Sequence, residues 1–116
     1  MTTITAAERR FLRSGVRSLA RIATVDEDGL PHVVPGGWSW DDGAGELVLG
    51  GRDVPTTARA GHVRRSGVAA VSIDGVHDGP GWSPWALLLR GPAVVADGAI
   101  RVRPDWSRSW GLDQPG

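Results

Sequence analysis

The sequence between residues 19 and 103 alternates between short apolar runs and tight turns rich in glycine and aspartate. Asp-Glu-Asp-Gly at 26–29 and Asp-Gly at 97–98 are typical turns, because these residues accept the backbone angles that hairpins require. The predicted strands cover residues 19–25, 31–40, 47–49, 68–74, 85–95 and 99–103. Six short strands joined in this way favour a mainly β fold, a six-stranded antiparallel barrel that leaves no edge free.

Two other segments have helical character. Thr5 is a good N-cap and Glu8 stands three residues later, so residues 5–14 begin with the spacing of a capping box. Residues 55–65 are compatible with a second short helix, and residues 75–84 form a loop rich in glycine and proline.

The chain is long enough for one domain but not for two. We therefore predict a single domain over residues 1–116, with an N-terminal helical segment at 1–17 and an irregular C-terminal tail at 104–116. Trp106 and Trp110 are expected to dock part of that tail onto the barrel.

The residue types that are missing exclude several kinds of chemistry. The chain has no cysteine, lysine or tyrosine, and all 13 of its basic residues are arginine. Thiolate catalysis, cysteine-based metal sites, Schiff bases and the P-loop lysine are therefore excluded. The formal net charge of +0 does not favour a nucleic-acid or membrane-surface partner. No signal peptide or membrane-spanning run is recognisable, so a cytoplasmic location is expected.

Six tryptophans are a heavy load for a chain of 116 residues. Tryptophan combines a large apolar area with one donor and is enriched at protein interfaces. Because a small domain buries only a modest core, we expect a homodimer that covers part of this surface. The alternative is that most of the tryptophans belong to the core.

Three segments, in the same order and spacing, resemble the split β-barrel proteins related to pyridoxamine 5′-phosphate oxidase, which bind FMN. They are Leu19–Val25 with Asp28–Pro35, then Gly50–Asp53 through Thr57 to Val63–Arg65 and Val68–Asp74, and finally Arg108–Asp113. The chain is most similar to the small actinobacterial branch that uses the deazaflavin coenzyme F-420. The resemblance implies a homodimer with two cofactor sites at the subunit interface.

The resemblance also implies where the cofactor lies. Its ring would run along the second strand, with these contacts: His32, Val34, Pro35, Gly36, Gly37 and Trp38. The residues alone allow a planar ring here, since the prolines remove ladder donors and the glycines leave backbone bare. The alternative interpretation of this segment is an edge strand with a bulge.

The cofactor phosphate would lie near the loop and helix that follow the third strand. Gly50 and Gly51 let a backbone approach a ligand closely, and a helix N-terminus attracts anions. Two guanidinium groups and a hydroxyl follow these glycines: Arg52, Thr57 and Arg59. The related pattern resembles Thr-Lys-Lys followed by Arg, whereas this chain has Thr57-Ala58-Arg59 and then Gly61. The alternative is an ordinary turn whose arginines pair with Asp53 or Asp74.

Other candidate residues carry weaker signals. The three histidines show no ligand spacing, so no metal site is expected, although His32 could donate a hydrogen bond to a substrate carbonyl. Trp82 and Trp85 flank a loop that could close over a substrate, or that could instead lie at the dimer contact.

Three functions remain open from the sequence. The leading hypothesis is a coenzyme F-420-dependent oxidoreductase that transfers hydride to or from a small molecule, since the cofactor carries the chemistry and no strong nucleophile is needed. The second is an FMN-binding oxidoreductase on the same barrel. The third is a dimer without a cofactor, acting as a binding module or as a non-redox enzyme such as a cyclase of a hydrophobic metabolite.

Overall fold

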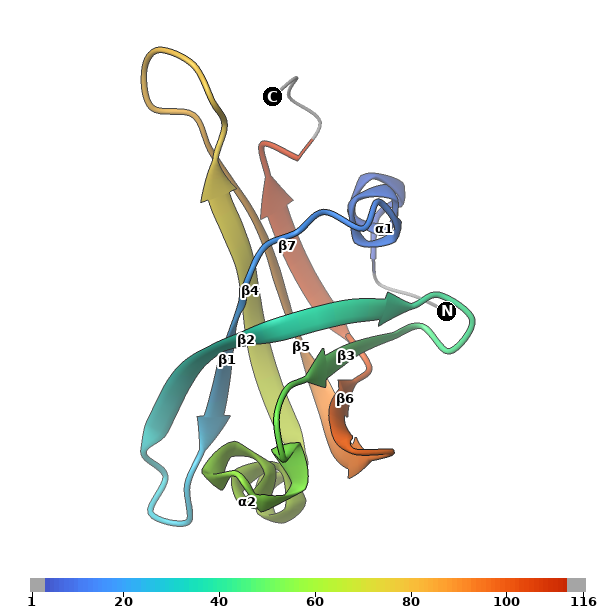
Figure 1. Ribbon diagram of the computed structural model, residues 1–116, viewed down its shortest axis with the longest axis vertical. Coiled ribbons are helices and arrows are strands. Elements are labelled where there is room, and N and C mark those ends of the chain that lie inside the picture. The colour runs from blue at the N-terminus through green and yellow to red at the C-terminus, as the bar shows by residue number, and fades with distance from the viewer. Residues whose placement is uncertain (1–3, 113–116) are drawn as a thin grey trace.

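A computed structural model describes residues 4–112 and consists of one β-barrel with two α-helices packed on it (Figure 1). The strands are β1 Ala20–Val25, β2 Pro31–Asp41, β3 Glu46–Gly50, β4 Val68–Val76, β5 Pro84–Ala96, β6 Ala99–Val102 and β7 Trp106–Trp110. The helices are α1 Ala6–Arg13, a single 3-10 turn η1 Val54–Thr56 and α2 Ala58–Ser66.

Six of the strands close the barrel in the order β4-β1-β2-β3-β6-β5, and β5 returns to β4. Each neighbouring pair is antiparallel. The prediction of a mainly β, six-stranded antiparallel barrel with two short helices is therefore confirmed. Strands β4 and β5 are longer than predicted, which shortens the predicted loop to residues 77–83.

The prediction of an irregular C-terminal tail is wrong for residues 106–110, which form β7 along the edge of β5. The segment between β6 and β7 crosses β5 closely, because the nitrogens of Arg103 and Asp105 donate to the carbonyls of Pro92 and Arg90. A methyl group on Gly91 would come within 2.1 Å of the Arg103 carbonyl oxygen, so only glycine allows this crossing. The predicted tail residues 113–116 lie outside the described part of the chain, as do residues 1–3.

The core consists of the inward side chains of the barrel strands. The largest fully buried ones are Ile22, Leu47, Leu49, Ile73, Leu87, Leu89 and Ile100. Along β1, β3 and most of β4 buried residues alternate with exposed or half-buried ones, as the two-residue period of a β-strand requires. Each such side chain contributes about 1.5–3 kcal/mol when it leaves water, so this set dominates the stability of the barrel.

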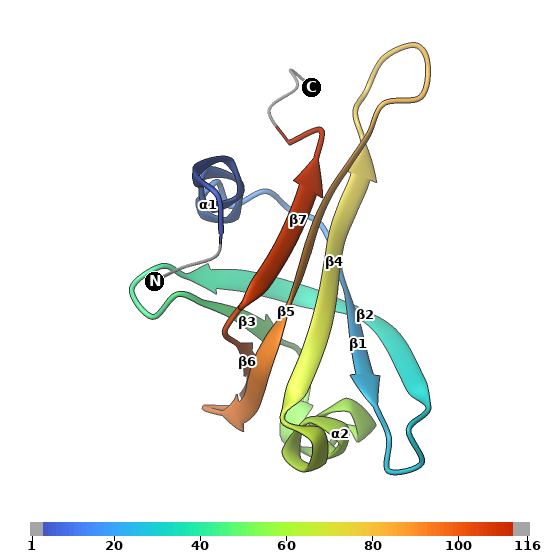
Figure 2. The same ribbon diagram turned by 180° about the vertical axis from the view of Figure 1, so that it is seen from behind.

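Helix α1 packs against the barrel wall near β2 and β7, and α2 lies at the other end of the barrel, as the view from behind also shows (Figure 2). The predicted capping box is present, because Thr5 Oγ1 accepts from the nitrogen of Glu8 while Glu8 Oε1 accepts from the nitrogen of Thr5. Neither helix of the described residues is long and apolar enough to cross a membrane.

Candidate functional site

Two glycines face each other across β2 and β3 and leave a patch of bare backbone on the outside of the barrel. The strand register places Gly37 opposite Gly50. A methyl group on either glycine would meet no other atom within 4 Å, so the space above both is open. We call this pair the glycine face; a flat ligand could lie on it and bond to main-chain groups.

The chain after β3 leads directly from the glycine face to the start of α2. Gly51 has a φ of 148° and Asp53 a φ of 49°, so the chain turns sharply into η1. Thr57 then caps α2, because its hydroxyl accepts from the nitrogen of Ala60 at 3.3 Å and donates to the carbonyl of Val54 at 2.6 Å. The N–H groups at the start of α2 that have no partner within the helix therefore lie close to the end of β3.

The side chain of Arg59 lies back over this turn. A methyl group placed on Gly51 would come within 3.2 Å of Arg59 Nη2. The Nε atom of Arg59 is buried and has no hydrogen-bond partner in the described residues. Since a buried donor without a partner is costly, this atom marks a place where an anion would be stabilised.

The alternative interpretation of these arginines does not agree with the contacts. Within residues 4–112 neither Arg52 nor Arg59 forms an ion pair, and Asp74 instead bonds to Arg21 at 3.1 Å. The hydroxyl of Ser72 donates a second hydrogen bond, of 2.7 Å, to Asp74 Oδ2. The pKa of Asp74 lies below its ordinary value because of these two partners, with the Ser72 hydroxyl contributing most. The positive charges beside the glycine face therefore remain available for a phosphate, and the residues fit such a group.

The other residues predicted along β2 divide between the two sides of the strand. Pro35 is exposed on the same outer side as Gly37, whereas Val34 and Gly36 face the core. A methyl group on Gly36 would press on the buried side chain of Ile22 at 3.0 Å. The outward residues are therefore the ones that a ring could reach from outside.

Trp38 also faces the barrel and is held by neighbours within the chain. Its ring stacks on Phe11 with a centroid distance of 6.0 Å, and its indole nitrogen donates to Ser18 Oγ at 3.3 Å. Trp85 contacts the other side of the same cluster, 5.2 Å from Phe11 between ring centroids. These aromatic side chains connect α1 to the barrel.

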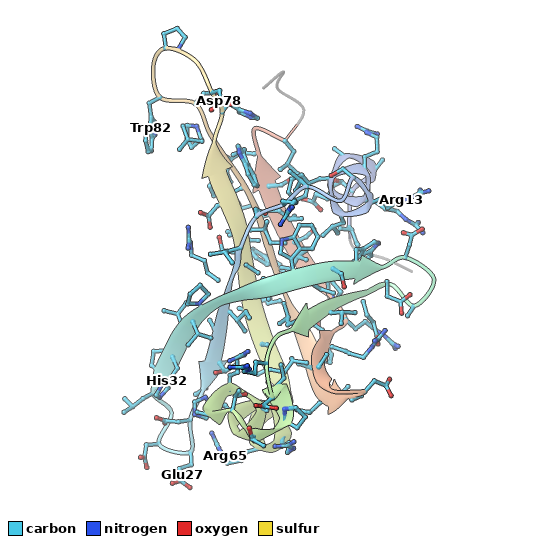
Figure 3. The ribbon with its side chains drawn as sticks, in the orientation of Figure 1. Arg13, Glu27, His32, Arg65, Asp78 and Trp82 are labelled. Carbon is cyan, nitrogen blue, oxygen red and sulfur yellow. The ribbon has the colours of Figure 1, made fainter. Side chains whose placement is uncertain are left out.

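The structure does not bring Trp82 near the glycine face. Trp82 is 80% exposed and lies in the loop between β4 and β5, at the opposite end of the molecule from His32 (Figure 3). Trp85 lies in the aromatic cluster instead, and its ring covers Gly75. Trp85 lines a small cavity with Phe11, Val16 and Leu112, and the wall of that cavity contains none of the predicted ring contacts.

His32 and His62 are in contact, although their spacing in the sequence gave no sign of it. Their ring centroids are 4.6 Å apart. Asp26 Oδ2 lies 2.8 Å from His32 Nε2, and Thr24 Oγ1 lies 2.9 Å from His62 Nδ1. Asp26 and His32 flank the hairpin turn between β1 and β2, so that turn was a signal for their pairing. The approach of His62 depends on the docking of α2.

The Asp26 carboxylate is strongly favoured in its charged form. The bond from His32 and the backbone N–H groups of Leu30 and Asp28 lower its pKa to about 2. Within the described part of the chain, no three histidine or carboxylate side chains are grouped closely enough to hold a metal ion.

A cavity of about 880 Å³ adjoins the glycine face. It lies between residues 15–19, which connect α1 to β1, and the second half of β2. Gly37, which also belongs to the glycine face, and Trp38 form part of its wall.

Comparison with known proteins supports the fold and gives one related sequence. No family model matches the chain. A curated protein of Streptomyces rimosus, 5a,11a-dehydrotetracycline/5a,11a-dehydrooxytetracycline reductase, is 26% identical over 121 residues. That match covers 94% of this chain and 84% of the reductase.

Solved structures with the same fold include flavin-binding and deazaflavin-related proteins. An FAD-binding protein of Mycobacterium smegmatis has a TM-score of 0.66 at 20% identity, with 95% of this chain and 98% of that chain covered. A candidate pyridoxamine 5′-phosphate oxidase of Corynebacterium glutamicum has a TM-score of 0.63 at 15% identity over 91% and 93%. A structure named F420 reductase has a TM-score of 0.59 at 17% identity over 78% and 89%. The chain therefore has the split β-barrel fold of the pyridoxamine 5′-phosphate oxidase-like proteins, as its sequence predicted.

Proposed function

We propose that this chain is an oxidoreductase that binds the deazaflavin coenzyme F-420 and transfers hydride to or from a small organic substrate. The observation that carries the proposal is the open glycine face of Gly37 and Gly50 beside Arg59, whose buried Nε has no hydrogen-bond partner among residues 4–112. A flat ring joined to a phosphate needs both features. The similarity to a dehydrotetracycline reductase and to an F420 reductase fold supports a redox role.

The chain's own residues would bind and orient the cofactor. Arg59 and the free N–H groups at the start of α2 would hold the phosphate, and the glycine face would let the ring approach the main chain. The bound deazaflavin supplies hydride transfer, in which two electrons move together. Arg52 is exposed on the same turn and lacks an ion pair within residues 4–112, so it is available to further anionic groups of a longer cofactor tail.

A second copy of the chain is the proposed partner, and it would cover a row on the outside of the barrel that is apolar except for Arg90. The register aligns outward residues from five strands in one row: Val33, Ala23, Ala70, Arg90 and Trp106. Val33 is 66% exposed and Trp106 37% exposed, with two alanines between them forming a shallow floor. Such an exposed apolar strip is typical of an interface. Val33 and Gly37 share one side of β2, so this interface would border the glycine face.

Titration of the purified protein with coenzyme F-420 and, separately, with FMN tests the proposal, with quenching of tryptophan fluorescence as the readout. We expect saturable micromolar binding of coenzyme F-420 and at least about tenfold weaker binding in Arg59→Ala. Arg64→Ala is the matched control, because Arg64 is exposed on α2 outside the turn. Tighter binding of FMN would assign the protein to flavin chemistry. The FAD-binding protein of Mycobacterium smegmatis is an example of a flavin-binding protein with this fold. Binding of neither cofactor would contradict a redox function and favour a cofactor-free dimer.

A further inference from the structure

The cavity beside the glycine face exists because β2 extends beyond the end of its neighbour β1. Pairing between β1 and β2 ends at Ala20 and Gly36, while β2 continues to Asp41 paired only with β3. The edge of β2 beyond Gly36 therefore carries main-chain groups with no strand beside them. Residues 15–19 pass along this edge at a distance that leaves about 880 Å³ between them, a size typical of small-molecule sites.

The wall of this cavity combines apolar side chains and two indole rings with polar and charged groups. Leu12, Val16, Leu19 and the rings of Trp38 and Trp40 line it. The indole nitrogens of the two tryptophans already donate within the chain, to Ser18 Oγ at 3.3 Å and to Asp42 Oδ1 at 2.9 Å. Both rings are thus fixed by the protein itself and can offer a ligand apolar contact.

The charges in the wall do not cancel. Asp42 Oδ1 accepts hydrogen bonds from Arg9 Nε and Trp40 Nε1, each at 2.9 Å, and these bonds, with the charges of Arg9 and of Arg13 at 3.7 Å, lower the pKa of Asp42 to about 2. The Asp42 carboxylate is therefore already paired with the arginines of α1. Arg17 also lines the cavity and forms no ion pair in residues 4–112. The cavity therefore contains one cation without a counter-charge, next to an unpaired strand edge.

We propose that this cavity binds the substrate, and that the substrate is a planar aromatic molecule with one acidic group. The acidic group would bind Arg17, and the aromatic body would lie against Val16, Leu19 and the tryptophan rings. Gly37 belongs both to this cavity and to the glycine face, so the far end of the molecule would lie beside the cofactor ring. This assignment rests on the proposed redox function for its reaction but not for its binding.

Binding of a simple probe in the absence of any cofactor tests this assignment. Isothermal titration calorimetry would compare 2-naphthoate, a planar monoanion, with its neutral methyl ester. The variants are Arg17→Gln and the control Arg64→Gln, since Arg64 is exposed on α2 away from the cavity. The indole N–H resonances of Trp38 and Trp40 report the location of the bound probe.

The expected result is that 2-naphthoate binds at least about tenfold more tightly than its ester, and at least about tenfold more tightly to the wild type than to Arg17→Gln. Arg64→Gln should bind as the wild type does, and the resonances of Trp38 and Trp40 should shift. Equal binding of the ester, unchanged binding in Arg17→Gln, no binding at millimolar probe, or shifts only at other tryptophans would overturn the assignment.

The two proposals can fail separately. If the probe binds as expected but neither cofactor binds, the redox function is wrong and the cavity remains a site for aromatic anions. If coenzyme F-420 binds but the probe does not, the redox function stands and the substrate assignment is wrong.

Discussion

The carboxylate of Glu8 accepts a 2.6 Å hydrogen bond from the hydroxyl of Ser109, although 101 residues separate them in the chain. Ser107 Oγ donates to the other carboxylate oxygen at 2.7 Å, and Glu8 is only 2% exposed. Burial alone raises the pKa of Glu8, but the bonds from Ser109, Ser107 and Thr5 together outweigh it, so the pKa lies below its ordinary value. One buried charge thus joins α1 to β7.

Ser109→Ala should therefore destabilise the protein. The change leaves one oxygen of a buried carboxylate without a partner, and we expect a loss of about 1–3 kcal/mol in the free energy of unfolding. Because the folded pKa of Glu8 is below its unfolded value of 4.5, its contribution is present above pH 4.5 and declines as the pH falls through the folded value. Urea unfolding at neutral pH and at pH 3 measures both effects. An unchanged midpoint for Ser109→Ala would show that the link is not stabilising.

Gly37→Val should block cofactor binding without harming the fold. Valine favours extended backbone, and a Cβ at this position meets no atom within 4 Å. The added side chain would stand on the glycine face where the ring is proposed to lie. We expect an unchanged or higher melting temperature together with at least about tenfold weaker binding of coenzyme F-420. Wild-type affinity in a folded Gly37→Val protein would place the ring elsewhere.

Ala70→Arg should convert the proposed dimer to a monomer. Ala70 lies in the middle of the apolar row, between Ala23 and Arg90, and a second arginine there would bring charge into the interface. Light scattering coupled to size-exclusion chromatography gives the mass of each form. Ala44→Arg, in the exposed turn between β2 and β3, is the control and should remain dimeric. A monomeric wild type would be evidence against the interface.

The bond between His32 and Asp26 should appear in the acid stability of the protein. The folded pKa of Asp26, about 2, is below the unfolded value of 3.8, so the carboxylate stabilises the fold fully above pH 3.8 and loses this effect as the pH falls toward 2. Asp26→Asn should show a smaller loss of stability across that window, because asparagine keeps the turn acceptor but has no proton to bind. His32→Ala should move the Asp26 pKa back toward 3.8, which carbon NMR of the carboxyl group can follow. An Asp26 pKa that does not move would mean that His32 is not its main partner.

Local signals in the sequence were sufficient for much of this fold. The capping box at Thr5 and Glu8 depends on residues three apart, and the hairpin turns depend on residues such as Gly29 that adopt positive φ angles. Short apolar runs bounded by these turns located the six barrel strands. These features follow from neighbours along the chain. The resemblance placed Gly37 and Arg59 at a cofactor site, and the residue types only allowed that placement.

Contacts between distant segments were decided only by the tertiary structure. Trp106–Trp110 has no apolar alternation and becomes a strand because the edge of β5 is available to it. His62 meets His32 only when α2 docks, and the cavity at Arg17 exists only because β1 stops pairing at Ala20 while β2 continues. The physical reason is that the free backbone groups of a strand edge, and a side chain that packs, bind to whatever the closed barrel places beside them. Such a partner is distant in the sequence, so neither of the two segments carries a periodic pattern that predicts the contact.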